Sequence, residues 1–238
     1  MHFVPGYSMM AATATTFMLS MIFLLLSGQS KKQYMRFWGI AWLVYSAMFL
    51  LDFCHLNWNF VYLGYVMLRQ MLALLGSYTF LLGTHHFFQI KCPAVLGFAA
   101  IISTISMILY PASYPVYTLM IIPNIIFSSG LLIYSGCMFI AISWTQKLPE
   151  KLIASFLIIL WSIFINHFAF SLKNQQLEIF SYFISIFTVN VLILTLIIIY
   201  FKKLRFIDTK QHNRFRLLVE NSSDSMFLYD YKRQQFEY

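Results

Sequence analysis

Long apolar runs separated by short polar breaks make up the first two hundred residues of the chain. A bilayer core about 30 Å thick needs roughly 20 apolar residues per helical span. Backbone groups in lipid must be bonded within their own segment, and no alternating barrel pattern is present, so we expect helices. The sequence thus predicts an all-α membrane protein, a seven-transmembrane helix bundle. The seven candidate spans are Tyr7–Leu26, Tyr34–Phe53, Val61–Phe88, Pro93–Tyr110, Val116–Ile142, Leu152–Ser171 and Leu177–Phe201.

The distribution of Lys and Arg between the loops predicts the orientation of these spans. With the N-terminus outside, the loops on the opposite side carry nearly all the loop cations, whereas the outer loops carry only Lys173. Cytoplasmic loops are enriched in Lys and Arg, so we expect the N-terminus outside and the C-terminal tail in the cytoplasm. The cations on that cytoplasmic side are Lys31, Lys32, Arg36, Lys91, Lys147 and Lys151, followed by "KKLR" from Lys202.

Composition narrows the class of protein further. The chain is 60% hydrophobic and only 10% charged, whereas about a quarter of a typical soluble domain is charged. The net charge of +8 comes mainly from cations at the ends of apolar runs, which argues against a nucleic-acid partner. The start "MHFVPGYSMMAATATTF" lacks the basic region of a removable signal peptide. The three cysteines show no disulfide or metal-ligand spacing.

Polar side chains inside the spans are the candidate functional residues, because ionisable groups there are costly. Arg69 lies eight residues into the third span, about 12 Å from the outer face, and Asp52 lies near the outer end of the second. We expect these two to meet. Gln70, Asn124 behind Pro123, and the pair Asn166 and His167 fall in the same outer half. Together these six side chains predict a polar pocket in which Arg69 holds a small polar or anionic ligand.

The same residues also fit a purely structural interpretation. Arg69 and Asp52 are equally suited to a pair that stabilises the bundle, and Asn and His side chains commonly bond neighbouring helices in membranes. Both interpretations stay open at this point.

Metal, cofactor and enzyme functions find no support in the sequence. His85 and His86 suggest a metal ligand pair near Cys92, but adjacent residues on a helix point about 100° apart. The seventh span holds no lysine for a retinal Schiff base, since Lys202 lies outside it. Paired carboxylates, a nucleophile elbow and a phosphate loop are not seen. We therefore expect no metal, no cofactor and no catalytic residue in this chain.

The tail, 202–238, differs from the spans. A linker helix is expected over 202–218, in which Leu204, Phe215 and Leu218 follow a 3–4 spacing with Phe201, Asp208 and Gln211. This helix either simply leaves the membrane or forms a homodimer through Leu204, Phe215 and Leu218. "ENSSD" then ends the helix, and "SMFLYDY" predicts a strand before a turn at "KRQQ" and a second strand.

Residues 214–238, within "RFRLLVENSSDSMFLYDYKRQQFEY", resemble the opening of a PAS domain. The matching positions are Phe215, Leu218, Glu220, Asn221, Ser222, Asp224 and Asp230. The match covers about a quarter of a PAS domain, so the resemblance implies an incomplete α/β domain, whose two strands are marginal in isolation. The stretches "FWGIAWLVYSAMFL" and "LRQMLALLGSYTFLLGTHHFF" are similar to the seven-span input regions of bacterial sensor histidine kinases and diguanylate cyclases.

These features predict three regions: a sensory domain over 1–201, a linker helix over 202–218, and the beginning of a PAS domain over 214–238. The expected function is a signal-input module in a bacterial inner membrane, which senses an outside or membrane cue and relays it to a cytoplasmic output domain. The expected partners are the lipid bilayer and a small ligand of unknown identity. A small-molecule transporter or channel is the alternative, against which no internal repeat or pair of broken helices is found. A purely structural membrane subunit is a third interpretation.

Overall fold

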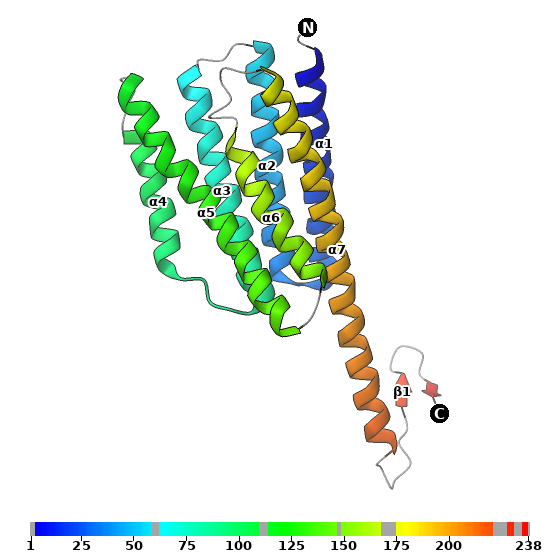
Figure 1. Ribbon diagram of the computed structural model, residues 1–238. Coiled ribbons are helices and arrows are strands. Elements are labelled where there is room, and N and C mark those ends of the chain that lie inside the picture. Colours follow the sequence, from blue (N-terminus) through cyan, green and yellow to red (C-terminus); the bar gives the residue numbers. More distant parts are fainter. Residues whose placement is uncertain are drawn as a thin grey trace. The chain divides into compact units, whose positions relative to one another are not determined.

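The computed structural model describes residues 3–58, 62–109, 114–146, 149–167, 175–220, 228–230 and 235–237. Seven helices occupy these ranges (Figure 1). They are α1 (Phe3–Ser30), α2 (Gln33–Trp58), α3 (Tyr62–Phe88), α4 (Ala94–Leu109), α5 (Tyr114–Gln146), α6 (Pro149–His167) and α7 (Gln175–Glu220). Each predicted apolar segment corresponds to one helix, which confirms the all-helical prediction for the membrane part.

Five of these helices are long and apolar enough to cross a membrane. Their candidate spans are Met9–Ser30, Gln33–His55, Gly64–Phe88, Ile122–Ser143 and Ile184–Asn213. The chain is therefore a multi-pass helical membrane protein. Helix α4 has 16 residues, about 24 Å, and is shorter than a typical hydrocarbon core. Helix α6 has 19 residues and begins with Pro149, Glu150 and Lys151. That α4 and α6 cross the membrane, as the fourth and sixth predicted spans, thus stays a prediction.

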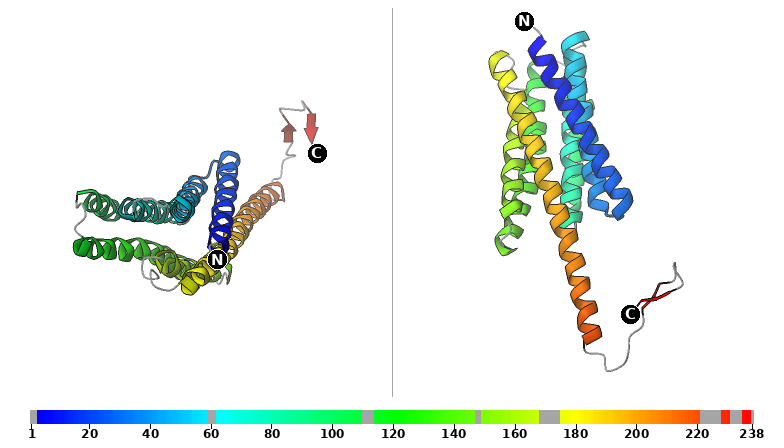
Figure 2. Two further views of the ribbon diagram at one scale, coloured as in Figure 1. Left: turned by 90° about the horizontal axis from the view of Figure 1, so that it is seen from above. Right: turned by 90° about the vertical axis from the view of Figure 1, so that its right-hand side faces the viewer.

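The chain divides into two units, Met1–Thr195 and Leu196–Tyr238, with the boundary inside α7. In the first unit α2, α3 and α4 follow one another in one row, and α5 and α6 lie in a second row beside it (Figure 2). Helix α3 occupies the middle, since it packs against α2, α4 and α5. Side chains along α3 are thereby placed among several neighbouring helices.

Glycines let bulky side chains approach neighbouring helices closely. A Cβ added at Gly83 of α3 would lie 2.4 Å from Cδ1 of Trp38, and one at Gly76 would lie 2.9 Å from the Tyr45 ring. Both rings come from α2. Gly136 of α5 receives Ile159 of α6 in the same way, at 2.8 Å. Because lipid tails give helices no hydrophobic reason to associate, such close packing is the main attraction between them.

Buried aromatic side chains fill the space between the two rows. Trp38, Trp42 and Trp161 are fully buried, and the Trp42 and Trp161 ring centroids lie 5.2 Å apart. Tyr45 meets Trp161 edge to face at 4.4 Å. Offset and edge-to-face contacts of this kind add stability beyond the area they bury. They fasten α2 in the first row to α6 in the second.

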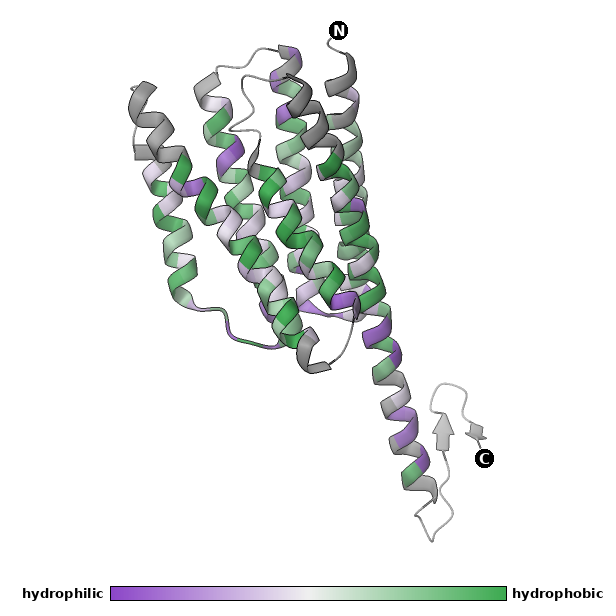
Figure 3. Cartoon of the chain, in the orientation of Figure 1, coloured by the Kyte–Doolittle hydropathy of each residue, from purple (hydrophilic) through white to green (hydrophobic). Residues whose placement is uncertain are grey.

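The second unit contains the C-terminal part of α7 and two three-residue strands, β1 (Leu228–Asp230) and β2 (Gln235–Glu237). The strands pair antiparallel, with Tyr229 opposite Phe236. A pair this short does not establish the incomplete PAS-like α/β domain, which stays a prediction. Within α7 the colouring of Figure 3 passes from hydrophobic to hydrophilic toward the C-terminal end. Phe201 and Lys202 mark the start of its basic half.

Candidate functional site

An ion pair between α2 and α3 is the centre of the candidate site. Nε of Arg69 donates to Oδ1 of Asp52 at 2.9 Å, and the two side chains are 3% and 0% exposed. The predicted meeting of these residues is confirmed. Asp52 lies six residues before the end of α2 and Arg69 seven residues after the start of α3. Both are therefore about 10 Å from a helix end. Because α2 and α3 are consecutive and run in opposite directions, these two ends lie at the same end of the bundle.

Two further groups complete the cluster around this pair. The hydroxyl of Tyr65 donates to the same Oδ1 of Asp52 at 2.8 Å. Nη2 of Arg69 donates to the backbone carbonyl of Ile165 in α6 at 3.2 Å. Tyr65 and Arg69 are four residues apart on α3, so they lie on one helix face. The cluster therefore ties α2, α3 and α6 together, and we call Asp52, Tyr65, Arg69 and the Ile165 carbonyl the charged cluster.

His55 adjoins the charged cluster on the side of the C-terminal end of α2. Its ring lies parallel to that of Tyr65, with centroids 3.8 Å apart and an interplanar angle of 5°. It is half-buried, three residues after Asp52 and three before the end of α2. The sequence reasoning did not single out Tyr65 or His55. Their spacing from Arg69 and Asp52, four and three residues, is the signal that could have identified them.

A second, uncharged group of polar side chains joins α3, α4 and α5. The amide of Asn124 donates to the backbone carbonyl of Gln70 at 3.2 Å and to Oε1 of Gln70 at 3.5 Å. Ser103 of α4 donates to Oδ1 of Asn124 at 2.7 Å. Asn124 and Gln70 are each 1% exposed. Two predicted site residues thus meet, and Ser103, which the sequence reasoning missed, joins them as the amide group cluster.

The two clusters belong to consecutive residues of α3, Arg69 and Gln70, and therefore lie at one depth of the bundle. Asn166 and His167 are part of α6 directly after Ile165, but their side chains lie outside the described residues. Their proposed role in a ligand site stays a prediction. The predicted shared depth thus holds for four of the six residues.

The electrostatics of the charged cluster favour a structural contact over a bare anion site. Arg69 is already neutralised by Asp52 and also bonded to a carbonyl oxygen. A second anion at Arg69 has to displace Asp52, whose charge is then left without its partner. Any further anion therefore competes with Asp52 for the guanidinium. Such a competition is the chemistry that a switch requires.

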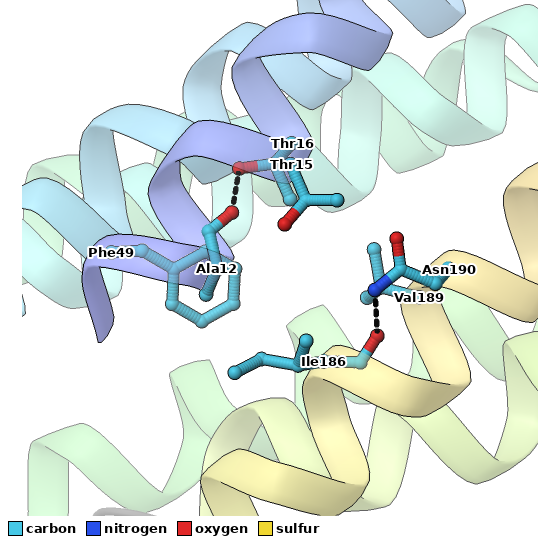
Figure 4. A pocket seen from close by; sticks show the side chains of 7 residues that line it. All are labelled: Ala12, Thr15, Thr16, Phe49, Ile186, Val189 and Asn190. Carbon is cyan, nitrogen blue, oxygen red and sulfur yellow. Dashed lines mark hydrogen bonds between the residues drawn. The ribbon is translucent and has the colours of Figure 1, made fainter. Parts of the chain in front are cut away.

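A separate small pocket lies between α1, α2 and α7, deeper than the charged cluster (Figure 4). It is a narrow recess with an open side and no room for a bound molecule. Thr16 and Asn190 direct their donors to carbonyls of their own helices, at 2.6 Å to Ala12 and 2.9 Å to Ile186. The lining is therefore largely apolar, and it includes none of the predicted ligand residues. It is formed by Ala12, Thr15, Thr16, Phe49, Ile186, Val189 and Asn190.

The adjacent histidines of α3 face different surroundings. His85 is 2% exposed and lies 5.9 Å from the Tyr134 ring, whereas His86 is exposed and stacks on Phe37 at 4.9 Å. Cys92 packs against a cluster of apolar side chains from α3, α4 and α5. Burial raises the pKa of the Cys92 thiol. Among the residues that the structure describes, no group of three His, Cys, Asp or Glu side chains is placed to hold a metal ion.

The predicted dimer contacts are described only in part. Leu204 is half-buried, and the side chains of Phe215 and Leu218 lie outside the described residues. A homodimer through these three positions stays a prediction.

No protein-family model matches the sequence, and no curated protein and no solved structure shows significant similarity to it.

Proposed function

We propose that the chain is a membrane-embedded signal-input module, in which a cue acting on the outer half of the bundle is relayed along α7 to a cytoplasmic PAS and output domain. In this proposal all seven helices cross the membrane, with the N-terminus outside. The resemblance of residues 214–238 to a PAS opening supports the identity of the receiving domain. The chain carries the input, and catalysis belongs to the domain that receives the signal.

The observation that carries this proposal is the length of α7. Its 46 residues give about 69 Å of continuous helix, more than twice a hydrocarbon core of about 30 Å. The candidate span begins at Ile184, and from Lys202 the helix is rich in cations. A continuous helix with an apolar half and a basic half is suited to pass a shift or rotation out of the membrane.

In this proposal the charged cluster is the element with two arrangements that a switch requires. It is buried, joins three helices and depends on one guanidinium shared between Asp52 and the Ile165 carbonyl. A cue that binds one arrangement more tightly than the other shifts their populations. Packed helices respond to such a change with shifts of about 1–2 Å rather than with continuous deformation.

The relay is tested with residues 1–220 fused to a cytoplasmic reporter domain whose activity depends on the rotation of its entry helix. Insertion of one residue after Thr209 rotates everything beyond it by about 100°, whereas insertion of seven residues nearly restores the phase. We expect reporter output to change with the single insertion and to return with the seven-residue insertion. Output that is indifferent to phase contradicts a relay through α7.

The role of the charged cluster is tested in the same fusion. Arg69→Met is expected to change reporter output without loss of membrane insertion, because it removes the guanidinium that holds α2 and α6. Arg36→Met is the matched control, since Arg36 is exposed near the opposite end of α2. Equal output from both variants and the parent removes the cluster from the mechanism.

A transporter or channel is favoured by one specific observation, a row of buried polar side chains on the inner faces of α3, α5 and α6. Three of them on α3 are spaced by seven residues, which keeps them on one face. Most of these hydroxyls donate to their own helix, for example Thr84 to the Phe80 carbonyl at 3.1 Å. Proton and cation flux into vesicles containing the purified chain distinguishes the two functions. The row consists of Gln70, Ser77, Thr84, Asn124, Ser128, Ser135, Ser155 and Ser162.

A further inference from the structure

The stacked pair of His55 and Tyr65 gives the charged cluster a titratable neighbour near the outer end of α2. Histidine is the side chain whose charge ordinarily changes between about pH 5 and 8. The His55 ring lies 3.8 Å from the Tyr65 ring, and the Tyr65 hydroxyl bonds Asp52 at 2.8 Å. Tyr65 therefore contacts the His55 ring through its face and the Asp52 carboxylate through its hydroxyl. We infer that His55 is a proton-binding site and that the cue acting on the charged cluster is the proton concentration outside.

Two groups near His55, Tyr65 and Asp52, attract a positive charge on its ring, and one, Arg69, repels it. The face of Tyr65, on α3, attracts a cation. Asp52 is three residues away on α2, so the two side chains are neighbours on the helix surface. Arg69 repels the new cation and is itself bonded to Asp52. Protonation of His55 is thus favourable for Tyr65 and Asp52 and unfavourable for Arg69.

The consequence is a competition for one carboxylate. With His55 neutral, Asp52 and Arg69 form a neutral pair at side-chain exposures of 0% and 3%. With His55 charged, two cations share the Asp52 carboxylate, and the attraction between α2 and the guanidinium of α3 weakens. The Ile165 carbonyl of α6 still binds Arg69. We therefore expect acidification to move α2 relative to α6.

The location of His55 fits access from the aqueous phase. It is the last residue of the candidate span Gln33–His55 and is half-buried, whereas Asp52 is 1% exposed. A proton from water reaches the ring without entering the hydrocarbon centre of the bilayer. His85, which is 2% exposed within α3, lacks that position.

The experiment measures the distance between spin labels on α2 and α6 of the full chain in lipid nanodiscs. The labels are placed through Leu50→Cys and Ile163→Cys, which are 50% and 57% exposed, after the native cysteines have been replaced by alanine. Distance distributions are recorded at about pH 5.5 and about pH 8. We expect the mean distance of the parent to differ by about 1–2 Å between the two conditions.

Three variants decide whether His55 causes that difference. His55→Gln is expected to keep the distribution of the higher pH under both conditions, and His55→Arg is expected to keep that of the lower pH. His86→Gln is the matched control, because His86 is exposed near the other end of α3, and it should respond like the parent. A parent without a pH response, a His55→Gln variant that still responds, or a His55→Arg variant that resembles the higher pH overturns the inference.

This inference rests on the proposed function, but the two fail separately. The label distances report only on α2 and α6, whereas the relay is measured through the reporter beyond α7. If the labels ignore pH while Arg69→Met still changes reporter output, the proton is not the cue and the relay remains. If the labels respond and the reporter ignores Arg69, His55 binds the proton but the relay is wrong.

Discussion

Removal of Arg69 provides the sharpest energetic test of the charged cluster. Arg69→Met deletes the 2.9 Å bond to Asp52 and the 3.2 Å bond to the Ile165 carbonyl. It also leaves the Asp52 carboxylate, whose side chain is 0% exposed, without its cation. Removing one member of a buried ion pair typically costs about 3–5 kcal/mol of unfolding free energy. We expect Arg69→Met to lose a free energy in that range.

Removal of both charges should be far less harmful. Replacing a buried ion pair by apolar residues of similar volume is often close to neutral. Asp52→Leu combined with Arg69→Met still leaves the Tyr65 hydroxyl without its acceptor, at a cost of about 1–3 kcal/mol. Adding Tyr65→Phe removes that donor. We therefore expect the triple variant to be more stable than Arg69→Met alone, by at least about 2 kcal/mol.

The assay is equilibrium unfolding in mixed micelles, followed by circular dichroism and by tryptophan fluorescence. The free energies of the single, double and triple variants form a mutant cycle, in which coupling appears as a departure from additivity. Two results refute the reasoning. One is a cost below about 1 kcal/mol for Arg69→Met, and the other is a cost for the double variant that equals the sum of the single ones.

Further expectations concern packing, backbone strain and thiol chemistry. Gly83→Ala should cost about 1–3 kcal/mol of unfolding free energy in the same assay, because its Cβ meets the Trp38 ring at 2.4 Å. Gly130→Ala is the control and should not destabilise, because nothing lies within 4 Å of its Cβ. Equal effects of the two substitutions contradict this packing argument. Gln89→Gly should stabilise by about 1 kcal/mol, since Gln89 has a φ of 60° after α3; an unchanged free energy means that the strain is absent. Cys92 should react with iodoacetamide more slowly than glutathione does near neutral pH, because its raised pKa lowers the thiolate fraction, and its rate should increase as pH rises. A rate for Cys92 above that of glutathione near neutral pH contradicts this expectation.

The helices were predictable because span length and apolar runs are properties of the sequence alone. Asp52 and Arg69 were predictable as a pair, since opposite charges at similar depths in consecutive spans have strong reasons to meet. Gln70 and Asn124 were predictable as members of one polar layer, but the bond between them was not predicted. In each case the polar atom is rare among apolar neighbours, so few partners compete for it.

The rest of the site depends on information that a single sequence does not display. The Ile165 carbonyl is a backbone group, and which carbonyl Arg69 reaches depends on how α6 packs. Tyr65 and His55 are inconspicuous because tyrosines near span ends also serve as interfacial anchors. Likewise, no pattern in the sequence placed Ser103 of α4 opposite Asn124. Helix rotation and packing decide these contacts.

Sidedness of the two chain ends tests the central claim most directly, because a relay through α7 requires an outer input and a cytoplasmic output. The measurement uses cells that carry one reporter active only outside the cytoplasm and one active only inside, fused in turn before Met1 and after Tyr238. The account predicts outside activity at Met1 and inside activity at Tyr238. Activity of both fusions on the same side contradicts it, because an even number of spans then separates the ends.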